Sequence, residues 1–71
     1  NFERAAELVN VPQDFIMSAY ELLRPGRAKS KQALLDVATT FRQTYHAERM
    51  AKFVEEAADV YERRGLFMHR Y

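Results

Sequence analysis

The sequence contains no cysteine and no tryptophan, and only two glycines and two prolines among its 71 residues. The lack of cysteine excludes a disulfide framework and a thiolate metal site, and it permits a reducing compartment. No apolar run approaches the roughly 18 residues of a membrane span. Eleven Lys and Arg against ten Asp and Glu give a net charge of +1, too small for a field that attracts nucleic acid or a membrane. We therefore expect a cytoplasmic chain that binds neither nucleic acid nor a membrane.

The length allows one helical domain, residues 1–71, with a thin hydrophobic core. A chain of this size buries only about 60% of the surface that it exposes when unfolded, so apolar burial and lost entropy nearly balance. We therefore expect the chain to gain stability by docking on a larger partner, or by self-association when it is isolated. The start at Asn1 shows neither an initiator Met nor a signal-peptide pattern, so we expect truncation at the N-terminus.

Apolar residues recur at spacings of three and four, which predicts an all-α fold, a small bundle of about four helices without strands. A first short helix has one apolar face, formed by Phe2, Ala5, Ala6 and Val9. A second helix is predicted from Pro12 to about Leu23, because proline suits a first helical turn and Asp14 complements the helix dipole. Its apolar stripe comprises Phe15, Ile16, Ala19, Tyr20 and Leu23.

Turn-forming and helix-capping residues after the second helix predict a turn and then a third helix. Residues 24–27 have the pattern of a type II turn, in which Pro25 fixes φ and Gly26 accepts a positive φ. Ser30 is a good N-cap for the third helix. The stripe of that helix, Leu34, Ala38, Phe41 and Tyr45, then loses its phase. A bend or tight turn is therefore predicted at 45–47.

The fourth helix has the strongest support in the sequence. Glu48 with Lys52, and Asp59 with Arg63, are favourable pairs four residues apart. Gly65 follows two arginines and predicts a left-handed, Schellman-type ending. The apolar stripe of this helix comprises Met50, Phe53, Val54, Ala57, Ala58 and Tyr61.

We expect no catalytic, cofactor-binding or metal-binding residue in this chain. His46 and Glu48 form an H-x-E pattern, but zinc needs a third ligand that only His69 could supply. Paired carboxylates could serve acid–base catalysis, but their spacing favours a solvated helix face; they are Glu55, Glu56 and Asp59. No nucleotide-binding or nucleophile-elbow motif is present.

Basic and aromatic side chains are the remaining candidates for function. Arg24, Arg27, Lys29 and Lys31 could contact phosphates, but a solvated loop or a rim that contacts an acidic partner is favoured. Tyr20, Phe41, Phe53 and Tyr61 have the spacing of core residues, although a thin domain should turn some of them toward a partner. The candidate partner contacts are Tyr20, Arg24, Arg27, Phe53, Tyr61 and Phe67.

Three segments in order carry a family resemblance: NFERAAEL (Asn1–Leu8), ELLRPGR (Glu21–Arg27) and AKFVEEAADVY (Ala51–Tyr61). With their spacing, they resemble the C-terminal portion of the small subunit of adenosylcobalamin-dependent diol and glycerol dehydratases. The resemblance covers nearly the whole chain. Helical phrases rich in alanine are weak signals singly, but three in the same order are much more specific.

The resemblance implies a lyase of large, medium and small subunits that converts 1,2-propanediol or glycerol to an aldehyde in propanediol utilization. Adenosylcobalamin would lie between the large and medium subunits, and no catalytic residue maps onto this chain. A small subunit would pack on the large one and support assembly and activity, often inside a bacterial microcompartment. One alternative is a helix-turn-helix-like DNA-binding module, whose third helix would contact the bases with Lys31, Gln32 and Arg42. The other is a free-standing protein-interaction module.

Overall fold

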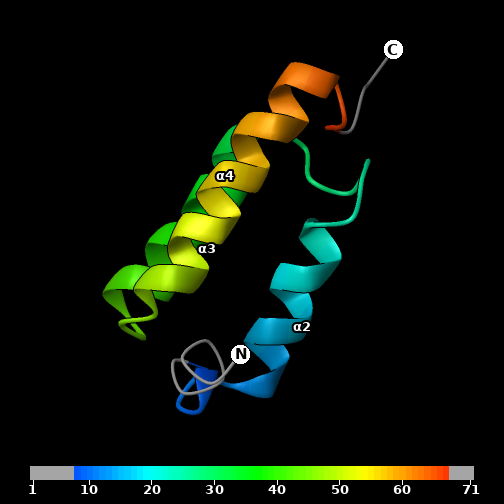
Figure 1. The fold of residues 1–71 in the computed structure, drawn as a ribbon. Helices are drawn as coiled ribbons and strands as arrows, with labels where there is room; N and C mark the ends of the chain where they lie inside the picture. Colours follow the sequence, from blue (N-terminus) through cyan, green and yellow to red (C-terminus); the bar gives the residue numbers. More distant parts are fainter. Residues whose placement is uncertain (1–7, 68–71) are drawn as a thin grey trace.

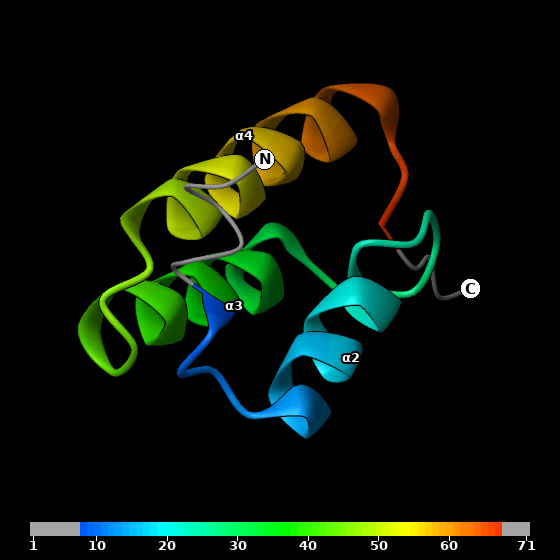
Figure 2. The ribbon, with the colours of Figure 1, turned by 60° about the horizontal axis from the view of Figure 1, so that its bottom comes forward.

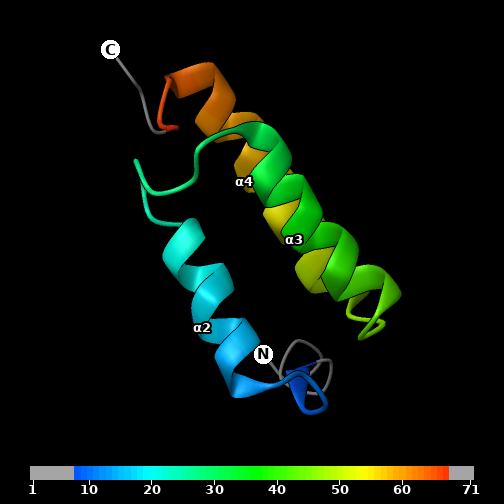
Figure 3. The ribbon, with the colours of Figure 1, turned by 180° about the vertical axis from the view of Figure 1, so that it is seen from behind.

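The computed structural model describes residues 8–67, and within this range the chain is helical and contains no strand. Its helices are α2 (Gln13–Leu22), α3 (Lys31–Gln43) and α4 (Glu48–Arg64). Helices α3 and α4 form an antiparallel pair, and α2 lies beside them (Figure 1 and Figure 3). The all-α class is therefore confirmed, and three of the four predicted helices are present.

The predicted first helix cannot be compared with the structure over most of its length. Three of its four apolar residues, Phe2, Ala5 and Ala6, lie outside the described residues. Its fourth, Val9, lies in a turn and is 76% exposed. A bundle of four helices is thus not confirmed, and Val9 is not a core residue.

Helix α2 begins directly after Pro12, as the sequence predicts. The carbonyl of Pro12 accepts a hydrogen bond from the backbone N–H of Ile16 at 3.1 Å, and Asp14 lies in the first turn. The helix ends at Leu22, one residue before the prediction. The turn that follows has Gly26 at φ 82° and a 3.1 Å hydrogen bond from the N–H of Arg27 to the carbonyl of Arg24. The predicted turn is therefore confirmed.

Helix α3 begins after Ser30, as predicted, but without the expected side-chain cap. Ser30 has an extended backbone and its hydroxyl makes no capping hydrogen bond. At the other end, His46 has φ 56°, the left-handed conformation that glycine usually supplies. The N–H of Ala47 donates to the carbonyl of Phe41 at 2.8 Å and closes the turn. The chain thus reverses direction at 45–47 as predicted.

Helix α4 ends in the predicted Schellman arrangement. Gly65 adopts φ 66° and ψ 37°. The N–H of Leu66 donates to the carbonyl of Tyr61 at 2.9 Å, and the N–H of Gly65 donates to the carbonyl of Glu62 at 3.3 Å. These two bonds satisfy carbonyls that the helix end would otherwise leave unpaired.

The core lies mainly in the seam between α3 and α4. Its largest fully buried side chains are Phe41, Leu34, Met50 and Val54. Alanines at 38, 51 and 58 are buried between them, and small side chains let the two helix backbones approach closely. Helix α2 lies along one side of this pair (Figure 2). The ring of Phe15 on α2 lies 4.9 Å from that of Phe41 and 5.5 Å from that of Tyr45.

Two aromatic residues predicted to be core are on the surface. Tyr20 is 47% exposed and Phe53 is 41% exposed. Helix α4 packs through the face that carries Met50 and Val54, so Phe53 lies at the margin of that face. Helix α2 turns Phe15 and Ala19 inward, which leaves Tyr20 at its edge.

Candidate functional site

The H-x-E pattern does not assemble a metal site from the described residues. His46 is exposed on the turn between α3 and α4. Glu48 is engaged elsewhere, because its Oε1 accepts a hydrogen bond from the Nε of Arg42 at 2.8 Å. His69 lies outside the described residues. In the part of the chain that the structure describes, no group of three His, Asp or Glu side chains is close enough to hold a metal ion.

Arg42 joins the margins of α3 and α4 through two carboxylates. Its Nη1 lies 2.8 Å from Oε2 of Glu55 and its Nη2 lies 3.2 Å from Oε1, a bidentate arrangement. Its Nε binds Glu48. The guanidinium holds the pKa values of both carboxyls, Glu48 and Glu55, below their usual range. Carboxylates held ionised in this way are poor proton donors near neutral pH.

Lys31 forms a second bridge between the same helices, near the other end of the pair. Its Nζ lies 2.7 Å from Oδ1 of Asp59 and 3.2 Å from Oε1 of Glu62. The hydrogen bond between Lys31 and Asp59 raises the pKa of the ammonium and lowers the pKa of the carboxyl. These contacts hold the start of α3 against the last turns of α4.

The two bridges correct two interpretations of the sequence. The carboxylates of α4 do not form a simple solvated face, because Glu55 and Asp59 bind cations of α3. The favourable pairs within α4 are not the ion pairs that form either, since Glu48 binds Arg42 and Asp59 binds Lys31. The cations of α3 lie closer to these carboxylates than the cations of α4 do. Spacing along α4 alone cannot show this, because it describes only pairs within one helix.

Replacing Arg42 with methionine should make stability less dependent on pH. The pKa values of Glu48 and Glu55 are lowered in the folded chain, so their contribution is fully present above the unfolded glutamate pKa of about 4.3 and disappears as the pH falls through the folded values. The difference in free energy of unfolding between the unsubstituted chain and Arg42→Met should therefore be largest near neutral pH and shrink below about pH 4. Urea unfolding at several pH values measures it.

Arg64→Met is the matched control, because Arg64 is exposed and makes no ion pair with the described residues. Its difference from the unsubstituted chain should be small at every pH. A difference for Arg42→Met that stayed constant between pH 7 and pH 3 would show that Arg42 acts through packing of its stem rather than through the carboxylates.

The helix-turn-helix interpretation is not favoured, because its proposed reading side chains bind within the chain. Lys31 binds Asp59, and Arg42 binds Glu55. The amide of Gln32 donates to Asp36 at 2.8 Å. A reading helix needs such groups available to base edges.

The six candidate partner contacts divide into two groups. Tyr20, Phe53, Arg24 and Arg27 lie on the surface, and the two arginines contact Glu21 at 3.4 and 3.3 Å. The remaining two, Tyr61 and Phe67, are half-buried and pack together, with ring centres 6.3 Å apart.

Tyr61 also connects distant parts of the chain. Its hydroxyl donates a hydrogen bond to the carbonyl of Leu23 at the end of α2. Its aromatic contact with Phe67 holds the segment after α4 close to the same place. Tyr61 therefore ties the end of α2 to the end of α4, a role that its place in an apolar stripe does not predict.

Sequence reasoning missed one exposed apolar residue on α2. Met17 is 61% exposed. It lies three residues before Tyr20, so the two side chains share one edge of the helix. The helical spacing could have indicated this exposure. Met17 lies two residues after Phe15 and two residues before Ala19, and therefore on the side of the helix opposite its inward face.

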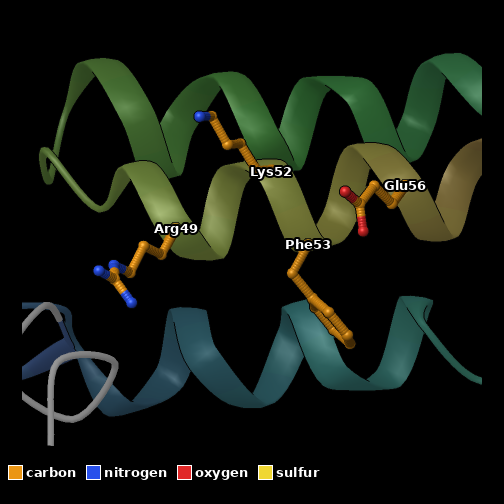
Figure 4. A pocket seen from close by; sticks show the side chains of 4 residues that line it. All are labelled: Arg49, Lys52, Phe53 and Glu56. Carbon is orange, nitrogen blue, oxygen red and sulfur yellow. The ribbon is translucent and has the colours of Figure 1, made fainter.

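An open hollow lies on the surface of α4 (Figure 4). It has a volume of about 260 Å3 and is lined by Arg49, Lys52, Phe53 and Glu56. In the close view, the ring of Phe53 extends from α4 toward α2, whereas Lys52 points away from α2. The hollow is smaller than the roughly 300–1,000 Å3 of typical small-molecule pockets. Among the described helices, none is long and apolar enough to cross a membrane.

These features define a class of protein: a small helical domain with ion-paired helix margins and exposed apolar side chains. The family model for the dehydratase small subunit matches residues 1–68. The chain therefore belongs to the dehydratase small subunit family.

Two curated relatives are named as propanediol dehydratase small subunits. The protein of Salmonella typhimurium (strain LT2) is 49% identical over 61 residues, which cover 86% of this chain and 35% of that protein. The protein of Citrobacter freundii is 48% identical over 61 residues, with the same coverage. The chain thus spans about a third of the length of the curated relatives that it matches.

Proposed function

We propose that this chain is part of the non-catalytic small subunit of a cobalamin-dependent diol or glycerol dehydratase. It packs on the large subunit and supports assembly and activity of a complex that also contains a medium subunit. The observation that carries this proposal is the family match over residues 1–68, together with relatives named as propanediol dehydratase small subunits. Work inside a bacterial microcompartment is part of the same proposal.

The surface supports a role in packing on another protein. Met17 and Tyr20 expose 61% and 47% of their surfaces along one edge of α2, and Phe53 is 41% exposed on α4. Methionine and aromatic residues are enriched in protein interfaces, where they fill pockets of the partner. A stable interface buries about 1,200–2,000 Å2 in total. We propose Met17, Tyr20 and Phe53 as apolar contacts within it.

The remaining candidate contacts have different roles in this proposal. Arg24 and Arg27 are exposed and belong to the rim of the interface. Tyr61 and Phe67 pack inside the chain, so they position the surface rather than touch the partner.

The described residues do not fit a cobalamin site. The hollow on α4 holds about 260 Å3 and three of its four lining residues are charged, whereas cofactor pockets are larger and mostly apolar. His46 is exposed beside an ion-paired Glu48. We therefore assign adenosylcobalamin to the other subunits of the complex, and we assign this chain no step of the reaction.

Coexpression of full-length subunits tests the proposal. The large and medium subunits are purified with and without the full-length small subunit, and complex size and aldehyde production from 1,2-propanediol and glycerol are measured. We expect omission to lower both, because the large subunit would then expose the apolar surface that the small subunit covers. Unchanged complex size and activity would contradict the proposal and favour a free-standing interaction module.

A double variant, Met17→Ser with Tyr20→Ser, tests the apolar contact in the same assay. Both side chains are exposed in the isolated chain, so the fold should survive while copurification with the large subunit falls. Thr39→Ser with Gln43→Ser changes two exposed residues of α3 and is the control. Equal copurification of the two double variants would exclude this edge of α2 from the interface.

A further inference from the structure

Two basic segments that are distant in the sequence meet at one end of the molecule. The loop of residues 24–30 follows α2, and Arg63 and Arg64 occupy the last turn of α4. The N–H of Gly26 donates to the carbonyl of Leu66 at 2.7 Å and holds the loop beside the end of α4 (Figure 1). The hydroxyl of Tyr61 binds the carbonyl at the end of α2 and secures the same junction.

Charge at this place, here called the basic end, exceeds that of the chain as a whole. The basic end has six cationic side chains, Arg24, Arg27, Lys29, Lys31, Arg63 and Arg64. Its three carboxylates are Glu21, Asp59 and Glu62, so the local charge is +3. The other described residues have three cations, Arg42, Arg49 and Lys52, and five carboxylates, Asp14, Asp36, Glu48, Glu55 and Glu56, a charge of −2. Among the described residues, positive charge is therefore concentrated at the basic end, although the net charge of the chain is only +1.

Part of this positive charge is available to a partner. Arg24 and Arg27 share Glu21, and their side chains remain 64% and 56% exposed. Lys29 and Arg64 are exposed and make no ion pair within residues 8–67. Lys31 is committed to Asp59 and Glu62. The available charge thus lies on the loop and on the last turn of α4.

We infer that the basic end docks on an acidic surface of the large dehydratase subunit. This inference rests on the proposed function and identifies which end of the small subunit approaches the partner first. The basic end follows directly on the apolar edge of α2, because Arg24 lies four residues after Tyr20, just beyond the end of the helix. An apolar centre with a charged rim is the usual anatomy of a protein interface. The charged rim speeds association and sets orientation.

Protein carboxylates fit the basic end better than nucleic acid does. Glu21 lies between Arg24 and Arg27, and it would repel a phosphate backbone. Lys31, Arg24 and Arg27 are also paired within the chain, so fewer cations are available than the roughly 6–10 phosphate contacts of a strongly salt-dependent DNA-binding protein require. Separate carboxylates on a partner can avoid Glu21 while pairing with Lys29 and Arg64.

Association kinetics test the inference in the full-length small subunit. Purified large–medium complex is passed over immobilised small subunit at about 50 mM and about 500 mM salt, where exposed charges are weakly and strongly screened. The double variant Lys29→Gln with Arg64→Gln lowers the charge of the basic end by two. We expect its association rate to fall about tenfold at low salt, the lower range of electrostatic steering, and to match the unsubstituted protein at high salt.

The matched control, Thr39→Glu with Gln43→Glu, lowers the net charge by the same two units on the exposed face of α3. Its association rate should stay within about threefold of the unsubstituted protein. Equal slowing of both variants, or slowing of neither, would overturn the inference while leaving the proposed function intact. Salt-dependent binding of a duplex DNA probe, with unchanged binding of the large–medium complex, would also overturn it. If the unsubstituted protein never binds that complex, the proposed function itself fails.

Discussion

Phe41→Ala should cause the largest loss of stability, about 3–5 kcal/mol in the free energy of unfolding. The side chain of Phe41 is fully buried between α3 and α4, and its ring contacts that of Phe15 at 4.9 Å. Its removal therefore leaves a cavity in the α3–α4 seam and also weakens the attachment of α2. A chain of this length has about 4–10 kcal/mol of stability in total, so the variant should lose a large share of it and unfold at a much lower urea concentration.

Phe53→Ala is the control, because it makes the same chemical change at a position that is 41% exposed. Its loss should be about 1 kcal/mol or less. Urea unfolding followed by circular dichroism gives both values. Similar losses for the two variants would mean that the seam between α3 and α4 does not form the principal core.

Tyr61→Ala should have the second largest effect, about 2–3 kcal/mol. Tyr61 is half-buried, so its loss should be smaller than the roughly 3–5 kcal/mol of a fully buried ring. The substitution removes the contact with Phe67 and the hydrogen bond to the carbonyl of Leu23. Because these contacts join the end of α2 to the end of α4, the loop of residues 24–30 should also lose protection from hydrogen exchange.

Tyr61→Phe separates the ring from the hydroxyl. It should cost about 1 kcal/mol, the usual net contribution of one hydrogen bond. Tyr20→Phe removes the same atom from a residue that is 47% exposed, and should change stability by less than about 0.5 kcal/mol. If Tyr61→Phe were as neutral as Tyr20→Phe, the hydroxyl would not hold the two helix ends together.

Much of the local structure could be predicted from the sequence. The turn at Gly26, the reversal around His46 and the left-handed ending at Gly65 all lie where the sequence places them. Such features depend on interactions between residues a few positions apart, so neighbouring letters are sufficient to predict them. The unpredicted detail at Ser30, whose hydroxyl makes no capping bond, is a side-chain orientation rather than a boundary.

The surface could be predicted only in part. The sequence identified Tyr20 and Phe53 as aromatic residues that could contact a partner, but it also placed them in core stripes, and it omitted Met17. An apolar stripe in the sequence shows which side of a helix is apolar. It does not show how much of that side the neighbouring helices cover. Helix α2 packs against the core through one side, which includes Phe15 and Ala19, so the apolar residues Met17 and Tyr20 remain in solvent.

The sequence by itself determined the all-helical class, the main turns and the family to which the chain belongs, because these depend on local spacing and on ordered segments of sequence. Only the tertiary structure decided which helix supplies the partner of each charge, as when Arg42 takes Glu55 and Lys31 takes Asp59. It also decided that the loop at Gly26 lies beside the end of α4. Coulombic attraction and hydrogen bonding act through space, over distances of a few ångströms that sequence separation does not measure.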